Sequence, residues 1–203
     1  MGSTTHAVAI GPRLVTKRYR SWARGEPHRE WRALGLLDAH VPGLAARPLR
    51  LVEGSPPVLE MSVVPGVELG AAPLTPPQLD ALAAALTRLH GGVPETVLRG
   101  LPPRIWAAAE LISHLVEVMA DASHDDPTLA PALTAARDWL ASTTAADLAT
   151  IVSPVLAQAD GNLANVLWDG SGCRLVDFED SGLGDRAIEL ADLVEHVSVT
   201  MSG

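Results

Sequence analysis

The sequence has few aromatic residues, a single cysteine and no long apolar run. With one cysteine, Cys173, the chain cannot form an internal disulfide framework. One phenylalanine and one tyrosine leave a mainly aliphatic core, in which we expect the five tryptophans to be the large side chains. No apolar stretch reaches the length of a membrane span, and no signal-peptide core is present near the start. We therefore expect a cytoplasmic protein with no membrane partner.

Positive charge is also scarce. The 15 lysines and arginines are outnumbered by 24 aspartates and glutamates, which gives a net charge of −9 at pH 7. No basic stripe stands out along the chain, so nucleic acid is not expected as a partner. An acidic surface suits a cationic small molecule, although it is equally typical of proteins that bind none.

Turn residues and apolar periodicity divide the 203 residues into expected strands and helices. Strands are expected at residues 6–10, 13–19, 47–52 and 57–64, followed by a hairpin formed by residues 165–168 and 173–178. Helices are expected at residues 27–39, 75–92, 103–122, 129–148 and 185–199. Residues 66–77 are rich in glycine, proline and alanine and fit a linker, and the polar residues 123–127 fit a solvated loop.

The most informative stretch runs from residue 156 to residue 193. Its hairpin would bring Asn165 and Asp177 to the same end, with Asp160 close by. Amide and carboxylate oxygens of this kind are ligands that Mg²⁺ takes together with phosphate oxygens. A carboxylate held away from the metal can accept a proton from a hydroxyl. Taken alone, Asp160 and Asn165 are better explained as ordinary turn residues, but the combination favours phosphoryl transfer.

Three motifs in this stretch resemble those of the aminoglycoside phosphotransferase and choline kinase-like family, relatives of the protein kinases. The catalytic loop of that family reads roughly H-G-D-x-x-x-x-N, and residues 158–165 here read QADGNLAN. VDFE at residues 176–179 resembles I-D-F/W-[DE], and GDRAIELA at residues 184–191 resembles G-D-P-x-x-D-L-A. Gln158 replaces the usual histidine, and Ala159 replaces the usual glycine.

The resemblance implies an α+β, protein kinase-like fold in two lobes. Residues 1–66 would form a small N-lobe with an antiparallel sheet and one helix, and residues 67–203 a mainly helical C-lobe with the catalytic hairpin. Asp160 would be the catalytic base, and Asn165 and Asp177 would hold Mg²⁺. The implied activity is ATP-dependent phosphoryl transfer to a hydroxyl of a small molecule, with an aminoglycoside-like antibiotic as one candidate acceptor.

Two charged residues of the expected N-lobe gain roles from the same resemblance. Lys17 would contact the nucleotide phosphates, and Glu30 would orient it. Without the resemblance, Lys17 reads as a solvated lysine on an edge strand and Glu30 as a carboxylate favoured near a helix start. The segment LEMSVVPG at residues 59–66 resembles the crossing between the lobes, which makes the backbone of Met61, Ser62 and Val63 the candidate adenine-binding hinge.

Three further residues are given structural roles. Cys173 lies in an expected strand and should be a buried small hydrophobe. His90 follows a leucine stripe and should pack or cap the helix end. Asp185 can cap the first turn of the last helix, and the resemblance implies that it braces the catalytic loop.

The resemblance leads us to expect a family fold that is reduced at both ends. About a dozen residues precede the lysine strand, and they contain neither a glycine-rich loop nor the Walker motif G-x-x-x-x-G-K-[ST]. The helices that usually follow the last one are also absent. A natural reduced member, a fragment and a protein completed as a homodimer all fit. Two other functions stay open: a non-catalytic nucleotide- or partner-binding module, and a kinase for a metabolite such as choline or a sugar.

Overall fold

The computed structural model of the protein describes residues 6–70, 73–121, 128–196 and 198. The chain divides into two compact units, one formed by Met1–Arg104 with Pro154–Gly203 and the other by Ile105–Ser153. Within the described ranges, no helix is long and apolar enough to cross a membrane.

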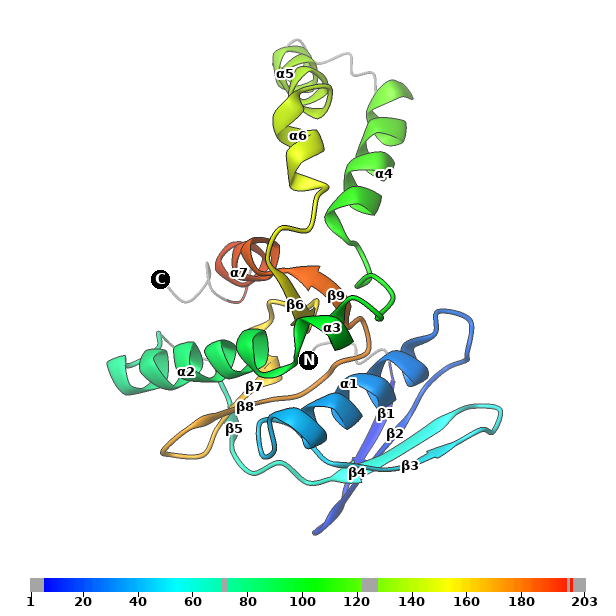
Figure 1. Ribbon diagram of the computed structural model, residues 1–203, viewed down its shortest axis with the longest axis vertical. Coiled ribbons are helices and arrows are strands. Elements are labelled where there is room, and N and C mark those ends of the chain that lie inside the picture. Colours follow the sequence, from blue (N-terminus) through cyan, green and yellow to red (C-terminus); the bar gives the residue numbers. More distant parts are fainter. Residues whose placement is uncertain (1–5, 71–72, 122–127, 197, 199–203) are drawn as a thin grey trace. The chain divides into compact units, whose positions relative to one another are not determined.

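A four-stranded antiparallel sheet and the helix α1 begin the first unit (Figure 1). The strand order is β1-β2-β4-β3, with β1 at Ala7–Ile10, β2 at Leu14–Arg18, β3 at Pro48–Val52 and β4 at Val58–Ser62. Alternate residues of a strand face the same side, and here Lys17 lies on the side of Val15 and Tyr19. Lys17 and Tyr19 are both buried, so the expectation of a strand at residues 13–19 is met but the lysine is not solvated.

Helix α1 runs from Glu26 to His40, one residue longer at each end than predicted. Its buried stripe contains Ala33, Leu34 and Leu37, and it contacts β3 and β4. Glu30 precedes Ala33 by three residues and Leu34 by four, so it lies on the same stripe and points into the core. The spacing of the apolar residues therefore explains why this carboxylate is buried.

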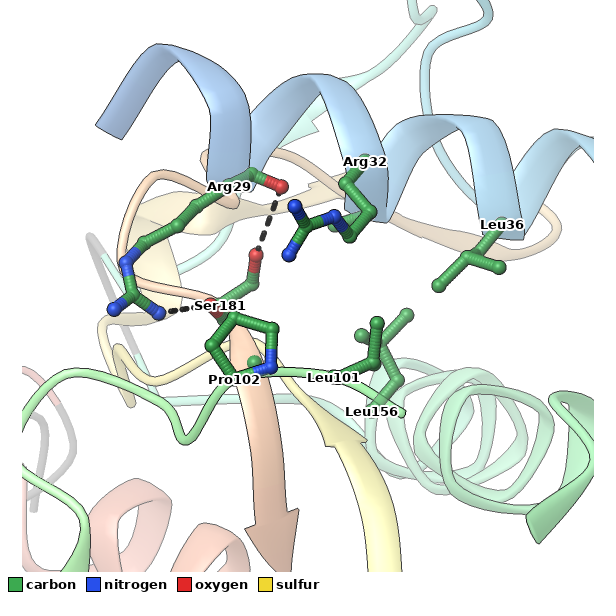
Figure 2. A pocket seen from close by; sticks show the side chains of 9 residues that line it. Arg29, Arg32, Leu36, Leu101, Pro102, Leu156 and Ser181 are labelled. Carbon is green, nitrogen blue, oxygen red and sulfur yellow. Dashed lines mark hydrogen bonds between the residues drawn. The ribbon is translucent and has the colours of Figure 1, made fainter. Parts of the chain in front are cut away.

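A hydrogen-bonded contact fixes α1 against the later part of the same unit (Figure 2). The Arg29 guanidinium donates to the carbonyls of Pro103 (2.7 Å) and Ser181 (3.1 Å), and the Ser181 hydroxyl donates to the Arg29 carbonyl (3.4 Å). The crevice beside them measures about 10 Å³, roughly the room that one water needs. The crevice is therefore a small packing gap and not a ligand site. The hydrogen bonds of Arg29 and Ser181 hold α1 beside residues 177–181.

Two further small sheets belong to the first unit. The sheet β5-β7-β8 comprises Val67–Glu68, Val166–Trp168 and Cys173–Leu175, and β6 (Pro154–Ala157) pairs with β9 (Gly182–Asp185). The predicted hairpin is thus formed by β7 and β8, with Val166 opposite Leu175. The predicted linker is partly wrong, because β5 lies within it and pairs with β7; its residues 71 and 72 lie outside the described part.

Helices complete this unit. They are α2 at Pro76–Gly92, α3 at Glu95–Leu98, the 3₁₀ turn η1 at Leu163–Asn165 and α7 at Arg186–Glu195. The limits predicted for α2 are met, with Thr75 and Gln78 forming the capping box at its start. The last helix was predicted to reach residue 199 but ends at Glu195, and residues 197 and 199 lie outside the described part.

The second unit contains α4 at Ala108–Asp121, α5 at Ala130–Leu140 and α6 at Thr143–Leu148. The single helix predicted at residues 129–148 is wrong. Ser142 breaks it, because its hydroxyl accepts a hydrogen bond from the Ala145 amide (3.3 Å) and so begins a new helix. The helix predicted from residue 103 starts five residues later, at Ala108, and the predicted loop at residues 123–127 lies outside the described part.

The core differs from the expected one in its aromatic residues. Tyr19 and Phe178 are its large rings, whereas none of the five tryptophans is fully buried. Trp106 is 49% exposed and Trp139 is 44% exposed. An indole can lie at the surface because it combines an apolar body with a polar N–H, and the Trp22 indole donates to the Gly54 carbonyl (3.0 Å). Cys173 is buried, as predicted, and His90 is also buried, which fits the predicted packing role.

Candidate active site

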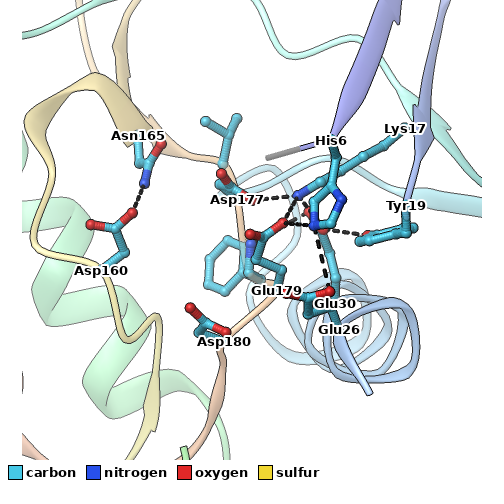
Figure 3. A network of polar contacts seen from close by, with 12 residues as sticks. His6, Lys17, Tyr19, Glu26, Glu30, Asp160, Asn165, Asp177, Glu179 and Asp180 are labelled. Carbon is cyan, nitrogen blue, oxygen red and sulfur yellow. Dashed lines mark hydrogen bonds and ion pairs between the residues drawn. The ribbon is translucent and has the colours of Figure 1, made fainter. Parts of the chain in front are cut away.

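Lys17 lies among three carboxylates (Figure 3). Its Nζ is 2.8 Å from Glu30 Oε2 and 2.6 Å from Glu179 Oε2, and it also contacts Asp177 Oδ1. Lys17 is 5% exposed and Glu30 is 1% exposed. The structure therefore brings together Lys17 and Glu30, the pair expected from the sequence. Lys17 is also the only lysine in the chain.

Three groups fix the Glu30 carboxylate. Besides Lys17, the Tyr19 hydroxyl donates to Oε2 (2.5 Å) and the Phe178 amide donates to Oε1 (3.4 Å). A carboxylate that accepts hydrogen bonds on both oxygens has a defined orientation. Glu30 thus connects α1 and β2 to the segment that carries Asp177.

The charges in this cluster shift the pKa values of its members. Burial alone would lower the pKa of Lys17, but Glu30, Asp177 and Glu179 outweigh burial and raise it. Burial, with a smaller effect of Asp177, raises the pKa of Glu179 to about 7, although Lys17 acts in the opposite direction. Lys17 is therefore a cation at neutral pH, while Glu179 titrates near neutrality.

His6 and Glu26 extend the cluster on the side of β1 (Figure 3). His6 Nε2 lies 3.2 Å from Glu179 Oε2 and 3.6 Å from Glu26 Oε2, and burial together with Lys17 lowers the pKa of the imidazole. The three ligand atoms are close enough to hold a metal ion. Both carboxylates already face a cation, however: Glu179 faces Lys17, and Glu26 Oε1 lies 2.9 Å from the Arg24 guanidinium. The two carboxylates are therefore ion-paired with Lys17 and Arg24, and His6 lies beside them as a buried imidazole.

The candidate catalytic loop, residues 158–165, places Asp160 and Asn165 in direct contact (Figure 3). The Asn165 side-chain amide donates to Asp160 Oδ2 (2.8 Å), and the Asn162 backbone amide donates to Asp160 Oδ1 (3.0 Å). The Val176 amide donates to the Asn165 carbonyl (3.0 Å), so Asp177 follows directly beside Asn165. The structure thus gathers the three predicted residues at one end of the hairpin.

The oxygen atoms at this end fit a hard cation. Asn165 uses its Nδ2 toward Asp160, which leaves its Oδ1 as an oxygen donor. The side chains of Asp160 and Asp177 are 41% and 40% exposed. Mg²⁺ usually takes one or two protein oxygens and completes its shell with water and phosphate. Asp177 contacts Lys17 through Oδ1, so its Oδ2 and the Oδ1 of Asn165 are the atoms that could hold it.

The two departures from the family loop have structural consequences. The Gln158 side chain donates to the Val176 carbonyl (2.6 Å), so glutamine ties the loop to the strand before Asp177. Ala159 has a φ of 68°, in the left-handed region that glycine favours. Asp177 also has a positive φ, 64°. Backbone strain of this kind is concentrated at functional sites.

Glu189 of α7 braces this loop. Glu189 Oε2 accepts the backbone amides of Gln158 (2.9 Å) and Ala159 (3.2 Å), and its Oε1 is 2.5 Å from the buried Arg104 guanidinium. Asp185 accepts the Ala187 amide (2.9 Å) at the start of α7, which is the predicted cap. The role of Asp185 in bracing the loop stays a prediction.

Gly161 lets the loop lie directly on α7. A Cβ atom at this position would be 2.3 Å from the Asp192 carbonyl oxygen, which is far inside van der Waals contact. Any side chain at Gly161 would therefore push Asp160 away from the helix.

The candidate hinge residues are at the end of β4. Met61 and Ser62 belong to the strand, and Val63 follows it. The Ser62 amide already donates to the Arg47 carbonyl (2.9 Å), and Met61 is 8% exposed. Contact of this segment with adenine stays a prediction.

Several residues of the site were missed in the sequence. Glu179 and Glu189 stand at acidic positions of the two motifs that follow the catalytic loop, so those motifs could have identified them. His6, Tyr19 and Arg104 carry no motif, and only the fold brings them to the site.

The sequence matches the Phosphotransferase enzyme family over residues 3–201, nearly its whole length. The chain belongs to this family. It is a phosphotransferase, as the resemblance of the catalytic hairpin implied, and the predicted family is confirmed. Among curated proteins, none matches the sequence.

Solved structures confirm the predicted kinase-like fold. Aminoglycoside phosphotransferase APH(3'')-Id from Streptomyces rimosus has a TM-score of 0.66 at 17% identity, over 99% of this chain and 80% of that chain. A choline/ethanolamine kinase family protein from Mesorhizobium loti has a TM-score of 0.66 at 19% identity, over 96% of this chain and 62% of that chain. A type I macrolide 2'-phosphotransferase has a TM-score of 0.59 at 17% identity, over 98% of this chain and 72% of that chain.

Proposed function

We propose that this phosphotransferase moves the γ-phosphoryl group of ATP to a hydroxyl of a small molecule, with aminoglycoside-like antibiotics as the first acceptor class. The contact between Asp160 and Asn165, beside an Asp177 that contacts Lys17, carries this proposal. These are the residue types that kinase-type transfer requires, in one place. The solved complex of APH(3'')-Id with ADP and streptomycin is consistent with it.

In this proposal Asp160 orients the acceptor hydroxyl and takes up its proton. The hydroxyl oxygen forms a bond to the γ-phosphorus while the bond from that phosphorus to the leaving ADP oxygen breaks. Because Asp160 is about two-fifths exposed and anchored by Asn165 and Asn162, a substrate hydroxyl can reach a carboxylate of fixed orientation. A positioned base of this kind typically contributes about 10²–10⁴-fold to the rate.

The nucleotide side of the site follows from the same contacts. Lys17, oriented by Glu30, would contact the phosphates, and Asn165 and Asp177 would hold Mg²⁺. When bound, Mg²⁺ neutralises phosphate charge. The backbone of residues 61–63 would contact the adenine, between an N-lobe of residues 1–66 and a C-lobe of residues 67–203. The net charge of −9 favours a cationic acceptor.

A second candidate function is a non-catalytic nucleotide-binding module. The position of Glu179 favours it. This carboxylate lies 2.6 Å from Lys17 Nζ and so already pairs with the ammonium group that the phosphates would need. A nucleotide must displace this carboxylate, or share Lys17 with it, before the phosphates reach the ammonium group.

Turnover of Mg²⁺-ATP with a panel of acceptors tests the first proposal. The panel contains aminoglycosides, sugars and choline, GTP is compared with ATP, and the phosphorylated product is identified by mass spectrometry. We expect an aminoglycoside product from the wild type and a loss of about a hundredfold or more in Asp160→Asn. Asp80→Asn, an exposed aspartate of α2, is the matched control and should keep wild-type activity. A choline or sugar product would identify a metabolite kinase instead.

Nucleotide binding can be measured separately because Lys17 is the only lysine. An ATP analogue with a lysine-reactive acyl phosphate should modify Lys17, and excess ATP should protect it. Labelling of Lys17 without phosphoryl transfer to any acceptor supports the non-catalytic nucleotide-binding module. No labelling and no transfer would contradict both candidate functions.

A further inference from the structure

His196 lies at the end of α7, beside the proposed catalytic base. Its Nε2 is 3.8 Å from Asp160 Oδ1, and its side chain is 29% exposed. This distance is longer than a hydrogen bond, so the contact is electrostatic. Asp160 Oδ2 accepts the Asn165 side-chain amide, which places His196 and Asn165 at different oxygens of the same carboxylate.

The hydrogen bonds of His196 define its tautomer. The Ser198 backbone amide donates to His196 Nδ1 (3.1 Å), and a backbone amide cannot accept. Nδ1 is therefore an acceptor, and in the neutral imidazole the proton is on Nε2, the atom that faces Asp160. The Ser198 hydroxyl, 2.8 Å from Nδ1, also accepts the Leu163 amide (3.0 Å) and so connects the imidazole to the catalytic loop.

We propose that His196 is a positioning residue for Asp160, with its Nε2–H beside Oδ1 keeping the carboxylate turned toward the acceptor hydroxyl. This inference rests on the proposed function of Asp160. A donor beside one carboxylate oxygen favours the rotamer that keeps this oxygen next to it. Since Nε2 already carries a proton, His196 is not a second base: the hydroxyl proton goes to Asp160, and His196 keeps its own.

Steady-state kinetics test this role. We expect His196→Ala to lower kcat about tenfold at an unchanged KM for ATP, less than the loss expected for Asp160 variants. His196→Gln keeps a side-chain N–H donor and should recover much of kcat. Val194→Ala, an exposed neighbour on the same helix end, should match the wild type. A wild-type kcat in His196→Ala, a change in KM alone, or a glutamine variant no better than alanine overturns the proposal.

Nitrogen-15 NMR of the histidine side chains tests the contact without turnover. We expect His196 as the Nε2–H tautomer, with a signal that shifts in Asp160→Asn and stays unchanged in Asp80→Asn. An Nδ1–H tautomer, or a His196 chemical shift that is the same in Asp160→Asn as in the wild type, overturns the proposal. A wild type that transfers phosphate to no acceptor contradicts the proposed function, and the NMR result then decides the His196 contact on its own.

Discussion

Glu189 accepts a hydrogen bond from the backbone amide of Ala159, with 3.2 Å between its Oε2 and the amide nitrogen. Ala159 stands where the family pattern has glycine, and its φ of 68° is left-handed. The brace from α7 therefore holds the residue before Asp160 in a conformation that costs an alanine roughly 1 kcal/mol or more.

Ala159→Gly should raise the free energy of unfolding by roughly 0.5–1 kcal/mol, because glycine adopts a positive φ without steric cost. Thermal unfolding should show a Tm about 1–4 °C higher. Ala84→Gly, at an exposed position of α2, is the matched control, and its free energy of unfolding should fall by about 1 kcal/mol. A lower Tm for Ala159→Gly would show that the loop conformation is not strained by the Cβ atom.

Lys17→Ala should cost roughly 3 kcal/mol of stability at pH 8, because it leaves the buried Glu30 and the partly buried Glu179 without their shared cation. Urea denaturation measures this loss. Arg50→Ala breaks the exposed pair with Glu60 and should leave stability almost unchanged. Similar losses for the two variants would contradict the argument from burial.

His90 should make the protein sensitive to acid. Burial, with a smaller effect of Arg186, lowers the pKa of this imidazole from 6.5 to about 4. Between these values the unfolded chain binds a proton that the folded chain does not, so stability falls as the pH drops from about 6.5 to about 4. Protonation of His90 should lower the free energy of unfolding by roughly 3 kcal/mol over this range. The free energy of unfolding of His90→Gln, followed across this range, should vary less with pH than that of the wild type; equal slopes would assign the effect to other groups.

Local chemistry explains why the catalytic hairpin was predictable. Asp169 Oδ1 accepts the amides of Ser171 (2.9 Å) and Gly172 (2.8 Å), which is the turn that its sequence indicates. At the start of α2, the Thr75 amide likewise donates to the Gln78 side chain (2.9 Å). In both places the stabilising contact is made within three residues, so it can be read from the sequence.

Non-local contacts explain what was missed. β6 pairs with β9 across about 25 residues, and one trace of this pairing in the sequence is Gly184, where a Cβ atom would lie 2.7 Å from the Ala157 side chain. His6 meets Glu179 only because β1 is the edge of one sheet and Glu179 follows a strand of another. The motif identified Asp160, Asn165 and Asp177 as a group, but it carries no information about side chains that arrive from elsewhere in the chain.

The burial of Lys17 also determines how the protein can be handled. With no second lysine, every permanently charged cation on the outside of the molecule is a guanidinium. Amine-reactive dyes and cross-linkers therefore meet no side-chain amine at the surface, and besides the chain terminus they can react only where the Lys17 cluster opens. The rate at which such a dye is incorporated would thus report the opening of this cluster in solution.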